Sequence, residues 1–127
     1  MIIVPKFPDT WPKECPPDDA VDAHGVVYRI ISGEAATPED FKSYEELGLA
    51  PNAPACSRRS VSVFNSRQGA CHRLKLSPRL GKGVAEGSID ATCGKMKLTS
   101  TKSGHIDWWP YEGINRLARF KETQPCP

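Results

Sequence analysis

The segment His105–Tyr111 reads His-Ile-Asp-Trp-Trp-Pro-Tyr and gathers the residue types best suited to chemistry. In a strand, alternation places His105, Asp107 and Trp109 on one face. An imidazole beside a carboxylate can exchange protons near neutral pH, so His105 and Asp107 are candidate catalytic residues. Trp109 and Tyr111 are candidate ligand contacts. An amphipathic strand that closes a hydrophobic core has the same pattern, and this alternative stays open.

A second set begins at Arg29, whose guanidinium must find a carboxylate, a carbonyl or an anionic ligand in its apolar strand. Ser60 and Ser62 follow on a later strand, and Glu86 on a third. This order resembles the Arg, Ser-x-Ser, Glu series of mono-ADP-ribosyltransferases. The resemblance implies that the Arg contacts a dinucleotide phosphate, that Ser orders the nicotinamide pocket, and that Glu stabilises an oxocarbenium-like transition state. It covers four residues, Val61 replaces the middle Thr, and no acid precedes Glu86 by two positions.

The structural alternative is that Arg29 bridges to Glu45 or Glu46 and that the serines face solvent. Other site types lack their signatures: the His and Cys residues have no zinc-site spacing, no Gly-rich phosphate loop occurs, and no Gly-x-Ser-x-Gly elbow surrounds Ser60 or Ser62. We therefore expect neither a metal nor a cofactor.

The charge is divided unevenly along the chain. Residues 1 to 55 carry four Lys or Arg against ten Asp or Glu, a net −6, whereas residues 56 to 127 carry thirteen against five, a net +8. The basic half can attract an anion, or the two halves can fold against each other. Lys95 and Lys97, near Trp109 and Tyr111, suit phosphates and unstacked bases, and we include them as candidate ligand-binding residues. The isoelectric point of about 8.3 is modest for a nucleic-acid-binding domain.

Length and cysteines limit the class of protein. A chain of 127 residues is of single-domain size. Its five cysteines are scattered without close-paired spacing, which predicts free thiols in a reducing cytoplasm. No secretory signal or membrane-spanning stretch is recognisable, so we expect a soluble cytoplasmic protein.

Local patterns predict the following elements. Residues 1–24 contain five prolines and form an extended arm lying on the body. A strand covers 25–32, a helix runs from Thr37 to Gly48, and 49–56 is a loop. A strand covers 59–64, and a helix capped by Asn65 ends before Ser77. Strands at 83–91 and 95–101 pair with each other and lead into the His105 strand. Residues 114–120 form a helix or an edge strand, and 122–127 a frayed tail that follows the 25–121 domain.

These elements predict a single small α+β domain, with a mixed or mainly antiparallel sheet of about five strands and two to three helices. The leading functional hypothesis is a small binding protein for an anionic partner: a nucleotide, a nucleic acid or an acidic protein surface. The first alternative is a nucleotide-using enzyme with Arg29, Ser62, Glu86 and His105. The second is an interaction module that uses the Pro-rich arm, also a possible oligomer contact, and exposed tryptophans.

Overall fold

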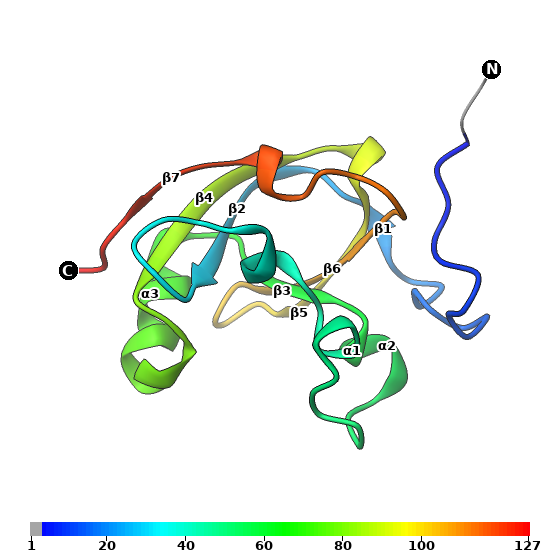
Figure 1. Ribbon diagram of the computed structural model, residues 1–127, viewed down its shortest axis with the longest axis horizontal. Coiled ribbons are helices and arrows are strands. Elements are labelled where there is room, and N and C mark those ends of the chain that lie inside the picture. Colours follow the sequence, from blue (N-terminus) through cyan, green and yellow to red (C-terminus); the bar gives the residue numbers. More distant parts are fainter. Residues whose placement is uncertain (1–3) are drawn as a thin grey trace.

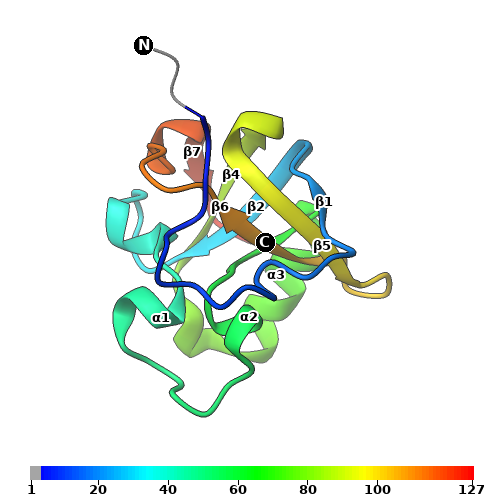
Figure 2. The ribbon, with the colours of Figure 1, turned by 90° about the vertical axis from the view of Figure 1, so that its right-hand side faces the viewer.

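The computed structural model describes residues 4–127, apart from the side chains at positions 122 and 123. One antiparallel sheet has the strand order β1-β5-β6-β3-β2-β4-β7. The strands are β1 Val21–Asp22, β2 Gly25–Ile31, β3 Val61–Phe64, β4 Gly83–Ile89, β5 Gly94–Ser100, β6 His105–Pro110 and β7 Phe120–Gln124. The helices are α1 Tyr44–Leu47, α2 Ala55–Arg58 and α3 Arg67–Leu76, and the 3₁₀ turns are η1 Pro38–Phe41, η2 Pro78–Leu80, η3 Ala91–Cys93 and η4 Leu117–Arg119. All three helices lie on one side of the sheet (Figures 1 and 2).

The α+β class is confirmed, but the sheet has seven strands and not five. The two additional strands are at the edges. The arm contributes β1, which pairs with β5, and the segment expected to be a frayed tail contributes β7, which pairs with β4. None of the helices described in residues 4–127 is long and apolar enough to cross a membrane.

Each face of the sheet has its own hydrophobic cluster. On one face Val27, Val61, Val63, Ile106 and Trp108 form the largest buried cluster. On the other face Phe64 and Val84 pack against Ala70 of α3. The candidate site lies on the α3 face, because strand alternation puts Ser62 and His105 on the same side as Phe64.

The predicted hairpin between residues 83–91 and 95–101 is wrong. Both strands exist, but β4 pairs with β2 and β7, while β5 pairs with β6 and β1. Strand β4 is buried on both faces over most of its length, as is usual for a strand with neighbours on each side. The turn η3 sends the chain to the far part of the sheet, so local sequence order did not reveal the pairing.

The single helix predicted from Thr37 to Gly48 is also wrong, since the structure has η1 followed by the one-turn helix α1. Lys42 between them is extended, and Ser43 begins the second turn by accepting a hydrogen bond from the Glu46 amide at 3.2 Å. The predicted stop is confirmed, because Gly48 adopts φ 71°, a left-handed conformation that glycine accepts readily.

The prediction of five free thiols is wrong for four of them. Disulfides join Cys15 to Cys56 and Cys71 to Cys126, and Cys93 is free and buried. The first bond attaches the arm to α2, and the second attaches the tail to α3. The partners are 41 and 55 residues apart in sequence, so spacing gave no indication of either bond.

The remaining elements are close to their predictions. Helix α3 is capped by Ser66 and not by Asn65, since Ser66 Oγ accepts from the Gly69 amide at 3.0 Å. Residues 114–120 contain the turn η4 and the start of β7. The described part of the arm, from residue 4, lies against the body, where Phe7 stacks on Trp11 and contacts Tyr111 at a centroid distance of 4.7 Å.

Candidate anion-binding cavity

A cavity of about 610 Å³ brings together candidate residues from three strands. Arg29 of β2, Ser62 of β3 with Ser60 just before it, and His105 of β6 all line this cavity, which α3 and the segment around Lys42 close. Four cationic side chains belong to its lining: Arg29, Lys42, Arg73 and Lys102. No Asp or Glu is part of the described lining, so the cavity is electropositive.

Arg29 holds the two central strands together at the point where they separate. The described register between β2 and β3 consists of Tyr28 opposite Phe64. Beyond that pair, Arg29 Nη1 donates to the Ser62 carbonyl oxygen at 2.8 Å, and Arg29 Nε donates to the Asp40 carbonyl oxygen at 2.8 Å. The guanidinium therefore donates to a carbonyl oxygen of β3 that a backbone N–H of β2 would bind if the two strands stayed paired.

The charge of Arg29 is not neutralised by an ion pair with any described carboxylate. Glu46, one of the two acids considered for that role, pairs with Arg116, and the Asp40 carboxylate accepts hydrogen bonds from Ser32 and Thr37. Burial lowers the pKa of Arg29, an effect that the nearby Asp40 partly offsets. Arginine nevertheless remains protonated at neutral pH, so this partly buried cation lies at the cavity wall.

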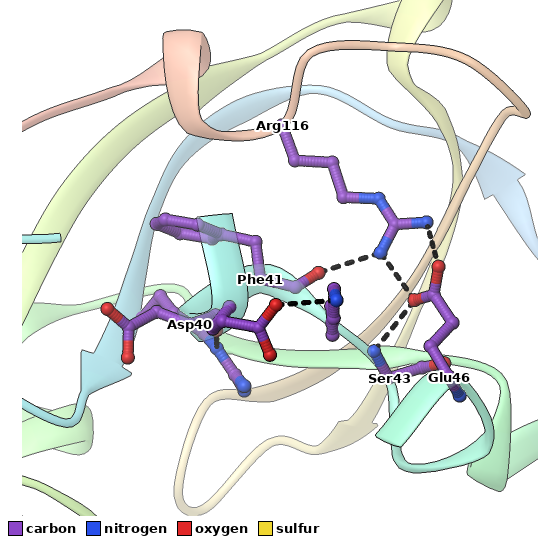
Figure 3. A network of polar contacts seen from close by, with 8 residues as sticks. Asp40, Phe41, Ser43, Glu46 and Arg116 are labelled. Carbon is purple, nitrogen blue, oxygen red and sulfur yellow. Dashed lines mark hydrogen bonds and ion pairs between the residues drawn. The ribbon is translucent and has the colours of Figure 1, made fainter. Parts of the chain in front are cut away.

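The segment that carries Lys42 and Tyr44 into the lining is fixed by a polar network (Figure 3). Arg116 donates to Glu46 through both Nη atoms, at 2.6 and 3.0 Å, and Arg116 Nη1 donates to the Phe41 carbonyl oxygen at 2.7 Å. Glu46 also accepts from the Ser43 amide at 2.8 Å. Because these bonds fix η1 and α1, the cavity wall does not depend on the short helices' own stability.

His105 has one ring nitrogen fixed by Thr99. The Thr99 hydroxyl donates to the His105 carbonyl oxygen at 3.2 Å and contacts Nδ1 of the ring. When the hydroxyl donates its one proton to the carbonyl oxygen, it accepts from Nδ1–H, and neutral His105 then carries its lone pair on Nε2. Burial lowers the pKa of His105, and Arg73 and Arg29 add to this effect against the opposing charge of Asp107. The neutral, basic imidazole is therefore favoured at the cavity.

Asp107 lies next to the cavity behind Ser60. The register pairs it with Ser62, and Ser60 Oγ donates to Asp107 Oδ1 at 3.0 Å. Burial raises the pKa of Asp107, although the bond from Ser60 and the charge of His105 lower it in part. Burial thus shifts both Asp107 and His105 toward their neutral forms, an arrangement that suits proton exchange.

Five other candidate residues do not line this cavity. Glu86 on β4 accepts from the Tyr28 hydroxyl at 3.3 Å. Lys95 and Lys97 pair with Asp22 and Asp19 of the arm, at 3.6 and 2.8 Å. Trp109 is buried and donates from its indole nitrogen to the Cys56 carbonyl oxygen at 2.8 Å, and Tyr111 contacts Phe7.

The sequence did not single out several lining residues. Arg73 and His72 of α3, Lys102 of the β5–β6 turn and Lys42 reach the cavity from separate elements. One available signal for Arg73 and His72 was the absence of Asp and Glu between residues 47 and 85, a stretch that includes α3 but neither Lys42 nor Lys102. A cation in such a stretch has no local acid to neutralise it.

Comparison with protein-family models, curated proteins and solved structures finds no match for the chain. Within residues 4–127, no group of three or more His, Cys, Asp or Glu side chains is arranged to hold a metal ion.

Proposed function

We propose that the chain binds a phosphorylated ligand of the nucleotide class in the cavity next to Arg29. The observation that carries this proposal is the composition of the lining, which contains four Lys or Arg side chains and no described acid; of the four, Lys42 has a described ion pair, with Glu39 outside the lining. Arg29 makes two hydrogen bonds to carbonyl oxygens and none is described from its Nη2, so it can donate to a phosphate oxygen without breaking an ion pair.

The rim supports a nucleobase in addition to the phosphate. Leu76 and Leu80 line the cavity with 64% and 41% of their surface exposed, and Tyr44 is 49% exposed. Flat bases pack on such apolar and aromatic side chains, whereas phosphates bind the cations of the lining. The serines of the wall can hydrogen-bond to a ribose.

Calorimetric titration with ADP, inorganic pyrophosphate and adenosine tests this assignment. ADP and pyrophosphate should bind, more tightly at low salt, and uncharged adenosine should bind much more weakly. The double substitution Arg73→Gln and Lys102→Gln should weaken ADP binding by roughly 100-fold or more, since each hydrogen bond to a charged group contributes ~1.5–3 kcal/mol. Lys13→Gln with Lys121→Gln, outside the cavity lining, is the matched control. Failure of ADP and pyrophosphate to bind at low salt would refute the proposal.

A second candidate function is transfer of an ADP-ribosyl group, which the position of His105 and Asp107 favours. His105 lines the cavity that also contains Arg29 and Ser62, and Asp107 lies next to it behind Ser60. Glu86 instead accepts a hydrogen bond from Tyr28. Asp107, in its ionised form, would then replace Glu86 as the group that stabilises positive charge on the ribose. In such a reaction the bond from nicotinamide to ribose C1′ breaks, an acceptor oxygen or nitrogen attacks C1′, and His105 Nε2 accepts its proton.

Release of nicotinamide from NAD, followed by chromatography, tests the enzymatic alternative. His105→Gln should abolish release and leave the thermal melt nearly unchanged. Arg79→Gln, at an exposed position outside the cavity lining, is the control and should retain full release. Binding of NAD without any release, in the presence of varied acceptors, would leave the chain as a binding protein.

The site of action is inferred from the disulfides. Free thiols were the basis for predicting a cytoplasmic protein, and four of the five cysteines are paired. Disulfides persist in oxidising environments and are rare in the cytosol of mesophiles. The two bonds therefore favour an oxidising compartment over a reducing one.

A further inference from the structure

Among the side chains that the structure describes, no carboxylate forms an ion pair with a cation of α3 or of the turn that follows it. Residues 47–85 contain no Asp or Glu but seven Lys or Arg. Elsewhere on the described chain, ion pairs hold Lys6, Lys42, Lys95, Lys97, Arg116 and Arg119. No ion pair is described for Arg73, Lys75 or Lys82, and the side chains of Lys75 and Lys82 are exposed. This face therefore presents a concentration of available positive charge.

A second hollow, of about 810 Å³, lies along another side of α3. Its walls come from the helix, from Lys82 and from residues 125–127, which the Cys71–Cys126 disulfide attaches to α3. Arg67, Lys75 and Lys82 line it, and its described lining contains no acid. His72 lines both hollows. The two electropositive hollows thus flank one helix and share a residue.

We propose that this face docks a single-stranded nucleic acid, with one nucleotide in the Arg29 cavity and neighbouring phosphates crossing α3 to Lys75 and Lys82. This inference rests on the proposed nucleotide site. A lone nucleotide would account for the first hollow but not for the uncompensated lysines of the second. Only a polyanion that extends beyond the cavity uses both hollows, and its backbone meets no acid between residues 47 and 85.

An acidic protein surface fits this face less well. Protein interfaces have an apolar centre surrounded by a polar rim. Here the exposed apolar side chains Leu76 and Leu80 belong to the mouth of the cavity, where they match the faces of a single base. Arg67 and Lys75 on α3 and Lys82 after η2 line the neighbouring hollow, so a base at this mouth can be followed by phosphates on those cations.

Fluorescence anisotropy with labelled single-stranded DNA and RNA 12-mers tests the proposal. Each phosphate contact on a single strand contributes about 0.7 to the slope of log K against log salt. Lys75→Gln with Lys82→Gln should therefore lower the slope by about 1.4, which corresponds to about 25-fold weaker binding at 0.1 M salt. The same double variant should bind ADP normally. Lys13→Gln with Lys121→Gln removes equal charge elsewhere and should leave the slope unchanged.

Three outcomes would overturn the docking assignment. One is an unchanged salt slope in the Lys75/Lys82 variant, and another is binding of poly-glutamate as tight as that of the oligonucleotide. The third is binding of ADP with no tighter binding of the 12-mers, in which case the nucleotide site stands without the docking surface. Failure of ADP to displace the oligonucleotide would instead refute the entry of a nucleotide into the cavity. The DNA and RNA arms identify which nucleic acid is bound.

Discussion

The guanidinium of Arg29 donates through Nη1 to the carbonyl oxygen of Ser62, 33 residues later, at 2.8 Å. This bond spans the separation of β2 and β3, so the same side chain both joins the two strands and supplies positive charge to the cavity between α3 and the sheet. Its stabilising and ligand-binding contributions are therefore linked, and substitutions must be chosen to distinguish them.

Arg29→Lys keeps the charge but has no planar fork to reach both the Asp40 and the Ser62 carbonyl oxygens. We expect a loss of about 2–3 kcal/mol in the free energy of unfolding, because at least one hydrogen bond from a charged donor is lost. Urea denaturation measures this change. Arg79→Lys, at an exposed position, should stay within about 0.5 kcal/mol of the native protein. Equal stability of the two variants would show that Arg29 does not join the strands.

Local patterns predicted much of the strand content, and long-range contacts explain the errors. The strands at β2, β3 and β6 were recognised because alternation and β-branched residues are local signals. The helix from Thr37 is interrupted at Lys42, which is extended, and Ser43 with Glu46 forms a second capping box that begins a new turn. The partners of β4 and β5 depend on pairing across the whole sheet, which no local window contains.

The candidate site was predicted in part for the same reason. Arg29, Ser62 and His105 stood out by residue type within strands, and the sheet order places those strands side by side. Lys95 and Lys97 stood out by charge alone, but acids of the arm neutralise them. The charge distribution predicts that the acidic half can fold against the basic half, but it does not identify which residues pair.

Gly69→Ala tests the contact between α3 and the β5–β6 turn. A methyl group there would lie 2.4 Å from the Ser103 carbonyl oxygen. Alanine inside a helix normally stabilises by about 1 kcal/mol over glycine. We expect the opposite sign here, a loss of about 1–3 kcal/mol from overpacking against backbone, measured by urea denaturation. Gly33→Ala, whose nearest neighbour would be 3.9 Å away, is the control and should cost little. A stabilised Gly69→Ala protein would contradict the close packing.

The disulfides predict a definite thiol count. Alkylation of the denatured, unreduced chain followed by mass spectrometry should label Cys93 alone, and labelling after reduction should reach all five cysteines. Cys71→Ser with Cys126→Ser should cost about 4 kcal/mol, as expected when a loop of this length is opened in the unfolded chain. Labelling of all five thiols before reduction would contradict both bonds.

Asp40 predicts a loss of stability in acid. Burial alone would raise the pKa of this carboxyl, but the hydrogen bonds from Ser32 and Thr37 outweigh it, so the pKa is lowered on balance. The stabilisation is therefore present above the unfolded pKa of about 3.9 and is lost as pH falls through the lower folded value. Asp40→Asn should cost about 1.5–3 kcal/mol at pH 7 and should weaken the dependence of stability on pH below about 4. Denaturation series from pH 2 to 7 measure both effects. A mutant curve parallel to that of the native protein would refute the role of Asp40.

The imidazole of His105 offers the most direct test of the proton-exchange arrangement. Nitrogen NMR of the neutral ring should show the proton on Nδ1, and Thr99→Val should shift the population toward the other tautomer, because Nδ1–H loses its acceptor. The charge of Asp107 raises the pKa of His105 against the larger effect of burial. Asp107→Asn should therefore lower the His105 pKa further. The resonances of His24 and His72 should not move with these substitutions and serve as internal references. A rise in the His105 pKa in Asp107→Asn would show that the Asp107 carboxylate does not stabilise the protonated imidazole. The enzymatic alternative would then lose its acid–base pair.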